Sequence, residues 1–293
     1  MNKLGIYTNF WEKNWTFDHI KYVKKAKAIG YDILEFQIQT LLDMTKERRA
    51  EIKNVATEEG IDLSYSIGLD MKYDVSSADD AVRETGIEYL KKLVEIVGSM
   101  DGKIISGVTY AGWGSPNYIV DDKSPILERS VDSMKKVVKT AEDYGVTYCF
   151  EAVNRFEACL INTAEEAVDY VLRVDSKNVG ILLDTYHMNI EENNLGDAIR
   201  LAGDKLAAFH TGDNNRRAPG RGHIDFDEIF QALSDINYQG GIVSEPFVQM
   251  GGEVGRDIKV WRNLDNTDEA SLDNEAAYLL KYTQDMLKKY NMA

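Results

Sequence analysis

Cysteine and proline are scarce in this sequence, and long apolar runs are absent. The chain has 2 cysteines and 4 prolines among 293 residues. Cys149 and Cys159 are too few for a disulfide framework, so we expect a cytoplasmic protein in a reducing compartment. No apolar run approaches the roughly 20 residues that cross a bilayer, and the first residues, MNKLGIYTNFWEKNW, contain no apolar signal-peptide core. The sequence therefore predicts no membrane partner.

Positive charge and histidine are also in short supply. Lysine and arginine total 34 against 49 aspartates and glutamates, which gives a net charge of -15. Broad contact with a nucleic acid backbone needs clustered Lys and Arg, so we expect no nucleic acid partner. The 4 histidines also disfavour a histidine-rich multi-zinc nuclease. A neutral small molecule or a cation is the expected partner.

Short apolar runs alternate with longer amphipathic segments along the whole chain. Hydrophobic residues make up 44% of the sequence and charged residues 28%, as in globular proteins. The runs are nearly continuous, which is typical of strands buried on both faces. The expected strands span residues 4–10, 32–36, 62–67, 103–109, 146–152, 180–184, 206–210 and 241–245.

Helical patterns lie between these runs. The clearest span residues 17–30, 126–145 and 278–290, and the first two end on glycine, a common helix stop. Thr163 opens another segment, TAEEAVDYVLRV, as an N-cap, with Glu166 three residues later as in a capping box. Eight strands with helices between them predict an α/β fold, a closed (β/α)8 TIM barrel that forms one domain over residues 1–293. The alternative is an open doubly wound sheet, but no G-x-G-x-x-G follows the first strand.

Four polar residues stand at the ends of the last four predicted strands. They are Glu151, Asp184, His210 and Glu245. In a (β/α) barrel these ends surround the active site, where three carboxylates would repel one another unless a cation bound them. One strand-end histidine is usually a structural residue, but four polar ends in succession are hard to obtain by chance. The donor set predicts one divalent metal ion per chain, Mn²⁺ or Co²⁺, with Mg²⁺ as a further candidate.

Other residues near strand ends are candidates for contact with a substrate. Three polar ones follow the metal candidates within six residues, although Arg216 could be a surface charge and Glu157 could simply pair with Arg155. Aromatic residues could wall a pocket for a carbon chain, although aromatic residues more often belong to the core. The polar candidates are Glu157, His187 and Arg216, and the aromatic candidates are Tyr7, Trp113 and Phe247.

Four long motifs resemble those of the ketose 3-epimerases of the D-psicose and D-tagatose type, a family within the sugar isomerase (β/α) barrels. The motifs are EAVNRFEACLINT, LLDTYHMNIEE, HTGDNNRRAPGRGHIDFDEI and SEPFVQMGGEVGRDIKVWR. The resemblance covers essentially the whole chain. It implies that Glu151, Asp184, His210 and Glu245 bind the metal ion, and that Glu157, His187 and Arg216 hold the substrate. It also implies a homodimer or a homotetramer.

The residues themselves fit epimerisation of a free ketose at C3. A metal ion chelated by O2 and O3 would stabilise the enediolate that forms when the C3 proton leaves. Inversion needs one base on each face, and Glu151 and Glu245 are the expected pair. An aldose–ketose isomerase on the same barrel and a non-catalytic sugar or metal binder are the alternatives. The substrate pairs D-psicose/D-fructose, D-tagatose/D-sorbose and L-ribulose/L-xylulose all fit this chemistry.

Overall fold

Eight parallel strands follow one another in chain order around a closed barrel. The computed structural model describes residues 2–114 and 121–292. The predicted (β/α)8 fold is therefore confirmed, and the open doubly wound alternative is wrong. The strands are β1 (Leu4–Tyr7), β2 (Ile33–Gln37), β3 (Asp62–Gly68), β4 (Ile104–Val108), β5 (Thr147–Ala152), β6 (Val179–Asp184), β7 (Leu206–Thr211) and β8 (Ile242–Ser244).

Helices occupy most of the connections between strands. The α-helices are α1 (His19–Ile29), α2 (Lys46–Glu59), α3 (Asp80–Ser99), α4 (Ser124–Tyr144), α5 (Ala164–Val174), α6 (Thr185–Glu191), α7 (Leu195–Ala202), α8 (Phe226–Asp235), α9 (Gly252–Asp257) and α10 (Glu269–Lys289). Short 3-10 segments are η1 (Thr8–Phe10), η2 (Ile38–Leu41), η3 (Met71–Tyr73) and η4 (Gly203–Lys205). Within the described ranges, no helix has both the length and the apolar character needed to cross a membrane.

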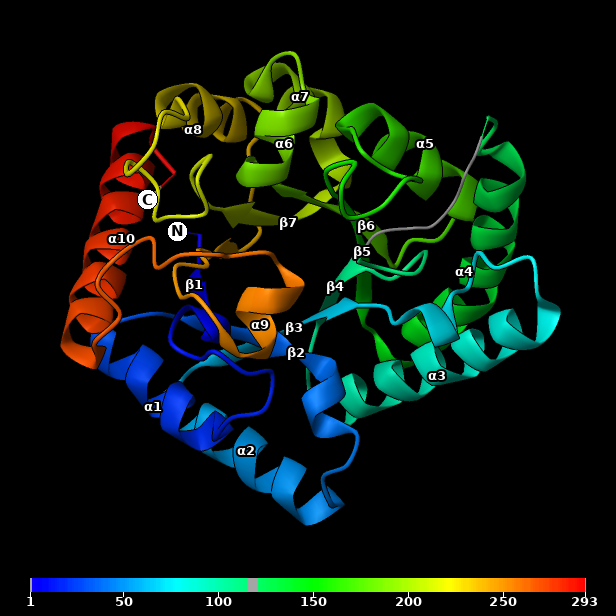
Figure 1. The fold of residues 1–293 in the computed structure, drawn as a ribbon, viewed down its shortest axis with the longest axis horizontal. Helices are drawn as coiled ribbons and strands as arrows, with labels where there is room; N and C mark the ends of the chain where they lie inside the picture. Colours follow the sequence, from blue (N-terminus) through cyan, green and yellow to red (C-terminus); the bar gives the residue numbers. More distant parts are fainter. Residues whose placement is uncertain (1, 115–120, 293) are drawn as a thin grey trace. The chain divides into compact units, whose positions relative to one another are not determined.

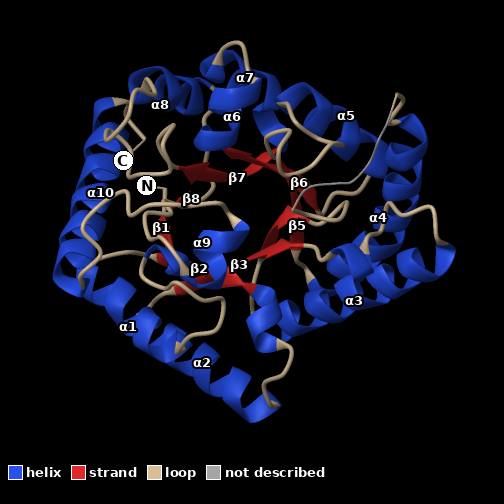
Figure 2. Cartoon of the chain, in the orientation of Figure 1, coloured by secondary structure: helices blue, strands red, loops and turns tan. Residues whose placement is uncertain are grey.

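The chain divides into two compact units. The first unit consists of Met1–Ser64 and Phe209–Ala293, and the second of Tyr65–Ala208. In each unit most helices lie on the outer side of the strands, whereas α9 of the first unit is drawn on their inner side (Figure 2). In the first unit β1 pairs with both β2 and β8, and β8 also pairs with β7. In the second unit β3 to β6 pair in sequence. The single domain over 1–293 stays a prediction.

The two ends of the chain are joined within the first unit. Helix α10 lies beside α1 (Figure 1), where Lys25 bonds to the carboxylate of Asp273 at 2.7 Å. The buried Tyr31 hydroxyl donates to the carbonyl of Ala276 at 2.9 Å. These contacts place a helix from the last part of the sequence against the first β/α segment.

An aromatic cluster forms the packing between strands and helices in the second unit. Tyr148 and Phe150 are on the same face of β5, and the ring of Phe150 lies 4.8 Å from that of Tyr170 in α5. Because side chains alternate along a strand, Cys149 and Glu151 point to the opposite face. Cys149 packs there against Leu182 of β6. Glu151 therefore lies on the face of β5 that points away from the helices.

Local signals in the sequence set several helix ends. Gly30 and Gly145 follow α1 and α4 with φ of 111° and 63°, the left-handed conformation in which glycine is favoured. Thr163 caps α5 as predicted, with its side chain accepting the N–H of Glu166. The reciprocal bond of a capping box is absent among the described contacts: Glu166 accepts the N–H of Asn162, one residue before the cap.

Candidate active site

Two predicted metal ligands lie on neighbouring strands of the second unit. Glu151 is the penultimate residue of β5, opposite Leu182 of β6, and Asp184 is the last residue of β6. The residues are 9% and 0% exposed, respectively. Buried carboxylates are costly unless a cation or hydrogen-bond donors compensate them, so this pair is a candidate for cation binding.

His187 lies beside this pair because a helix begins directly after β6. Asp184 is the N-cap of α6 and accepts the N–H of Tyr186 at 2.7 Å. This turn brings the ring of His187 back to the strand end, with Nε2 3.5 Å from Oε1 of Glu151. Glu151, Asp184 and His187 each have a ligand-type atom within 4.8 Å of the others, a geometry that could hold a metal ion.

The carboxylate of Glu157 is held in the loop after β5. Nε1 of Trp113 donates to one oxygen at 2.9 Å, and Nδ2 of Asn154 donates to the other at 3.1 Å. Arg155 instead pairs with Glu191, at 2.8 Å, and its hydrogen bonds lower the pKa of that carboxyl group. The simpler explanation that Glu157 pairs with Arg155 is therefore wrong. Asn154 had no role in the sequence prediction.

Trp113 lies over the end of β3 because the strand ends in glycine. A Cβ atom on Gly68 would lie 2.7 Å from the indole ring, well inside van der Waals contact. The ring is half-buried, and its Nε1 points to Glu157. Gly68 thus permits a position in which Trp113 both presents an apolar surface and orients a carboxylate.

The other two predicted ligands lie together in the first unit. His210 is the penultimate residue of β7, and Glu245 follows the last residue of β8. The N–H of Glu245 donates to the carbonyl of Thr211 at 2.9 Å, so pairing with β7 continues one residue beyond β8. Of the four predicted strand-end residues, only Asp184 occupies the last strand position. Nδ1 of His210 lies 3.7 Å from Oε1 of Glu245.

Glu35 completes this group, although the sequence had given it no role. It lies in β2, is 2% exposed, and accepts a hydrogen bond from Oγ of Ser64 at 2.6 Å. Its other oxygen lies 2.9 Å from Nε2 of His210. Ligand-type atoms of Glu35, His210 and Glu245 lie within 4.8 Å of one another. The available signal was a glutamate inside the apolar run DILEF.

Arg216 belongs to the same group and is not a surface charge. The residue is 7% exposed, and Nη1 lies 3.3 Å from Oε2 of Glu245. Its guanidinium carbon is 5.2 Å from the centre of the Phe247 ring, a cation–π contact. The N–H of Phe247 donates to the carbonyl of Arg216 at 2.9 Å, which ties the two loops together.

Tyr7 and Phe247 form an aromatic wall with a third residue that the sequence did not indicate. Their rings meet edge to face at 5.6 Å and pack with Val254 and Val260. Both are almost fully buried, so most of their surface belongs to the core. Trp15 packs against this cluster and is only half-buried. Trp15 lies in the loop after η1 and not at the end of a predicted strand, so the strand pattern did not indicate it.

The other two histidines are not among the predicted site residues. His19 is buried at the start of α1, and its Nε2 lies 2.9 Å from the Thr40 hydroxyl. Burial lowers the pKa of His19 from 6.5 to about 4, so the ring is neutral near pH 7. His223 is exposed.

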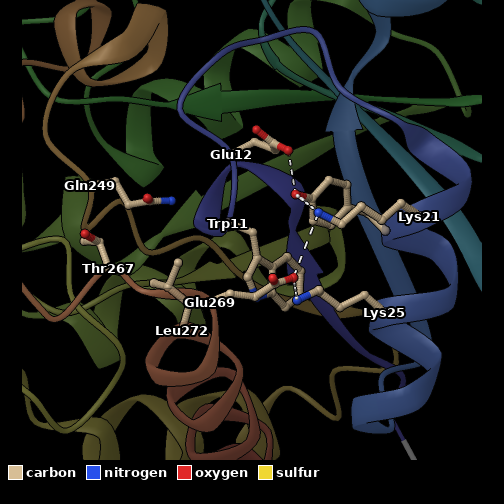
Figure 3. Close-up of a pocket in the computed structure, with 9 residues that line it drawn as sticks. Trp11, Glu12, Lys21, Lys25, Gln249, Thr267, Glu269 and Leu272 are labelled. Carbon is tan, nitrogen blue, oxygen red and sulfur yellow. Dashed lines mark hydrogen bonds and ion pairs between the residues drawn. The ribbon is translucent and has the colours of Figure 1, made fainter.

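A cavity of about 230 Å³ lies elsewhere in the first unit (Figure 3). Stacked rings of Trp11 and Tyr22 line it, and Lys25 bonds to Glu269 at 2.9 Å. Tyr22 donates to Glu12 at 2.5 Å, so the charged and polar groups of the lining compensate one another. Its lining, taken from the described residues, includes none of the predicted site residues. We assign it no role.

Comparison with known proteins identifies the group to which the chain belongs. The xylose isomerase-like TIM barrel family matches residues 23–264. The D-psicose 3-epimerase of Ruminiclostridium cellulolyticum is 43% identical over 287 residues, 98% of each chain. That of Enterocloster bolteae is 41% identical over 283 residues, 96% of this chain and 94% of the relative.

A solved structure extends the likeness to three dimensions. The crystal structure of the D-psicose 3-epimerase from Clostridium cellulolyticum H10 with D-tagatose has a TM-score of 0.95 and 43% identity, and it covers 97% of this chain and 99% of that chain. Identity at this level over whole chains, on the same closed barrel, indicates common descent and a shared type of reaction. This chain therefore belongs to the xylose isomerase-like TIM barrel family and, within it, to the ketose 3-epimerases, a group of isomerases.

Proposed function

We propose that this epimerase interconverts free ketohexoses of the D-psicose/D-fructose type at C3, with two glutamates as the acid and the base. The observation that carries the proposal is a pair of largely buried glutamates at strand ends, each beside an imidazole: Glu151 near His187 and Glu245 near His210. The relatives named D-psicose 3-epimerase support the choice of substrate.

We further propose that one divalent metal ion is bound by Glu151, Asp184, His210 and Glu245. Three carboxylates and one imidazole suit Mn²⁺ or Co²⁺, and Mg²⁺ is also compatible with them. The environment of His210 fits such a role. Nε2 faces the Glu35 carboxylate, a natural hydrogen-bond acceptor, which leaves Nδ1 with a lone pair on the side of Glu245. When bound, the ion supplies a Lewis acid for the substrate oxygens.

The two glutamates carry the proton transfers in this proposal. One removes the proton from C3, and the other returns a proton to the opposite face, with the roles exchanged in the reverse direction. They belong to β5 and β8, three strands apart in the barrel order. The contact between Arg216 and Glu245 would place a positive charge near the oxygens that gain negative charge during the reaction.

The remaining site residues hold the sugar. Glu157, His187 and Arg216 bind O1 to O3 in this proposal, because each is a buried or half-buried polar group whose position other residues restrain. The apolar faces for C4 to C6 come from Tyr7, Trp113 and Phe247 in this proposal. Trp15, which packs on the cluster of Tyr7 and Phe247, is added to them. Flat apolar surfaces beside a few polar groups are typical of sugar-sized pockets.

Product analysis in deuterium oxide tests the proposal. The protein is incubated with Mn²⁺ and D-fructose, and the reaction is stopped at low conversion. We expect D-psicose that carries deuterium at C3, because the returned proton comes from a group that exchanges with solvent. An aldose product would indicate an aldose–ketose isomerase, and the absence of any product with a panel of ketoses would indicate a binder. Product without deuterium at C3 would end the two-glutamate mechanism.

Assembly and location complete the proposal. We propose a homodimer or homotetramer in the cytoplasm. Both cysteines are free thiols, with Cys149 buried, which supports a reducing compartment. Light scattering on the purified protein tests the assembly, and a single species with the mass of one chain would contradict it.

A further inference from the structure

Asn154 is a buried polar residue between two of the proposed substrate-holding groups. It follows β5 by two residues and is 2% exposed. Its side-chain oxygen accepts the N–H of Phe156 at 3.0 Å, which fixes the orientation of the amide. The NH₂ group must therefore point the other way, toward His187 and Glu157.

Two donors of Asn154 converge on one nitrogen of His187. The main-chain N–H lies 3.2 Å from Nδ1, and Nδ2 of the side chain lies 2.7 Å from the same atom. A neutral imidazole has one acceptor nitrogen and one donor nitrogen. Among the described contacts, the nearest carboxylate oxygen, Oε1 of Glu157, lies 3.9 Å from Nδ1, beyond hydrogen-bond distance. Because the two atoms within hydrogen-bond distance are both donors, Nδ1 must be the acceptor, and the hydrogen of the ring is on Nε2.

This tautomer decides what His187 can do. Nε2 faces Oε1 of Glu151 at 3.5 Å, and a nitrogen that carries a hydrogen has no lone pair for a metal ion. His187 is then a hydrogen-bond donor at the site, although its ring lies close enough to Glu151 and Asp184 to suggest a ligand. His210 has the same tautomer, since its Nε2 faces the acceptor Glu35. Its Nδ1, however, faces Glu245 and keeps a lone pair for a metal ion, whereas Nδ1 of His187 faces the donors of Asn154.

The same amide also orients Glu157. The second hydrogen on Nδ2 of Asn154 is directed to Oε1 of Glu157 at 3.1 Å, while Trp113 binds the other oxygen. We propose that Asn154 is a positioning residue that holds His187 as the Nε2–H tautomer and orients Glu157, so that both bind the ketose. The part of this inference that concerns the sugar rests on the proposed function.

Nitrogen-15 NMR of the histidine rings tests the tautomer without substrate. With the protein supplied with Mg²⁺, a diamagnetic ion, we expect Nδ1 of His187 to give the signal of an unprotonated nitrogen and Nε2 that of a protonated one. In Asn154→Asp, a carboxylate oxygen replaces the side-chain donor, so the proton is expected on Nδ1. A protonated Nδ1 in the unaltered protein would overturn the inference, even if the protein epimerises ketoses.

Kinetics distinguish positioning from a structural role. Asn154→Asp has almost the same shape as the native residue, yet we expect it to lower kcat/KM by roughly 10- to 100-fold with metal content retained. Asn154→Ala keeps the main-chain donor and should lose less. A structural role would predict the reverse order, and unchanged kcat/KM in Asn154→Asp would also reject the inference.

Asn162 provides a matched control in the same loop. Its side chain donates to the carbonyls of Val153 and Ala158 at 2.7 and 2.9 Å. Asn162→Ala should lower the melting temperature while the His187 tautomer and kcat stay close to those of the unaltered protein. Equal losses of kcat in Asn162→Ala and Asn154→Asp would show that loop order is responsible. Absence of ketose turnover in the unaltered protein would reject the proposed function and leave the tautomer measurement to decide the role of Asn154.

Discussion

Arg216 and Arg217 are adjacent in the sequence but occupy different environments. Arg216 is almost fully buried beside Glu245 and the ring of Phe247. Arg217 pairs with both oxygens of Asp265, at 2.6 and 2.9 Å. The two residues therefore allow the same substitution to be compared inside and outside the proposed site.

Arg216→Ala should lower kcat/KM by roughly 100- to 1000-fold, because a charged donor near the reacting oxygens is lost. The metal content should stay near one per chain, because Arg216 binds the substrate in our proposal and not the metal ion. Glu157→Ala is expected to behave in the same way. Arg217→Ala should leave turnover nearly unchanged and cost at most about 1 kcal/mol of stability. Steady-state kinetics and metal analysis are the measurements, and loss of the metal ion in both site variants would contradict the division of roles.

His19 should make the free energy of unfolding depend on pH. Burial lowers its pKa in the folded state to about 4, whereas the unfolded chain binds a proton near pH 6.5. Below pH 6.5 the unfolded state therefore binds more protons, and stability falls as the pH decreases toward 4. Near pH 4 this effect should lower the free energy of unfolding by about 3 kcal/mol. Urea unfolding from pH 4 to 8, compared with His19→Gln, measures it; an identical pH dependence in both proteins would reject this assignment.

At the scale of elements, local signals predicted helix ends and strands well. The Thr163 cap and the glycine stops at Gly30 and Gly145 depend on residues within one turn of the helix end. The last helix begins at Glu269, well before the predicted stretch 278–290, because Asp268 caps it by accepting the N–H of Ser271 at 3.0 Å. Strand ends were less certain, since Glu245 lies beyond β8 and is held by a bond to β7.

At the scale of the molecule, removal of the metal ion tests whether residues at the ends of different strands bind one ion. A ligand that binds only the folded state, present at 100 times its Kd, adds about 2.7 kcal/mol of stability. Treatment with a chelator should therefore lower Tm by roughly 5 °C and abolish activity. Mn²⁺ or Co²⁺ should restore both. Asp184→Asn should remove the response of Tm to metal ions, and full activity in the metal-free protein would exclude a catalytic metal ion.

The sequence alone was sufficient to predict the (β/α)8 barrel and the polar strand ends. Continuous apolar runs, glycine stops and caps depend on residues that are near one another in the chain, so they can be recognised without knowledge of the tertiary structure. The resemblance to ketose 3-epimerases likewise depended on continuous motifs, such as the one that contains Glu151 and Glu157.

Only the tertiary structure decided which partner each polar side chain has. Glu35 lies far from His210 in the sequence, and Arg155 pairs with Glu191 although Glu157 is nearer in the chain. Asn154 and His187 meet because β5 and β6 are paired. The side of an imidazole that carries the hydrogen depends on whether its neighbour donates or accepts, and the fold supplies that neighbour from another strand.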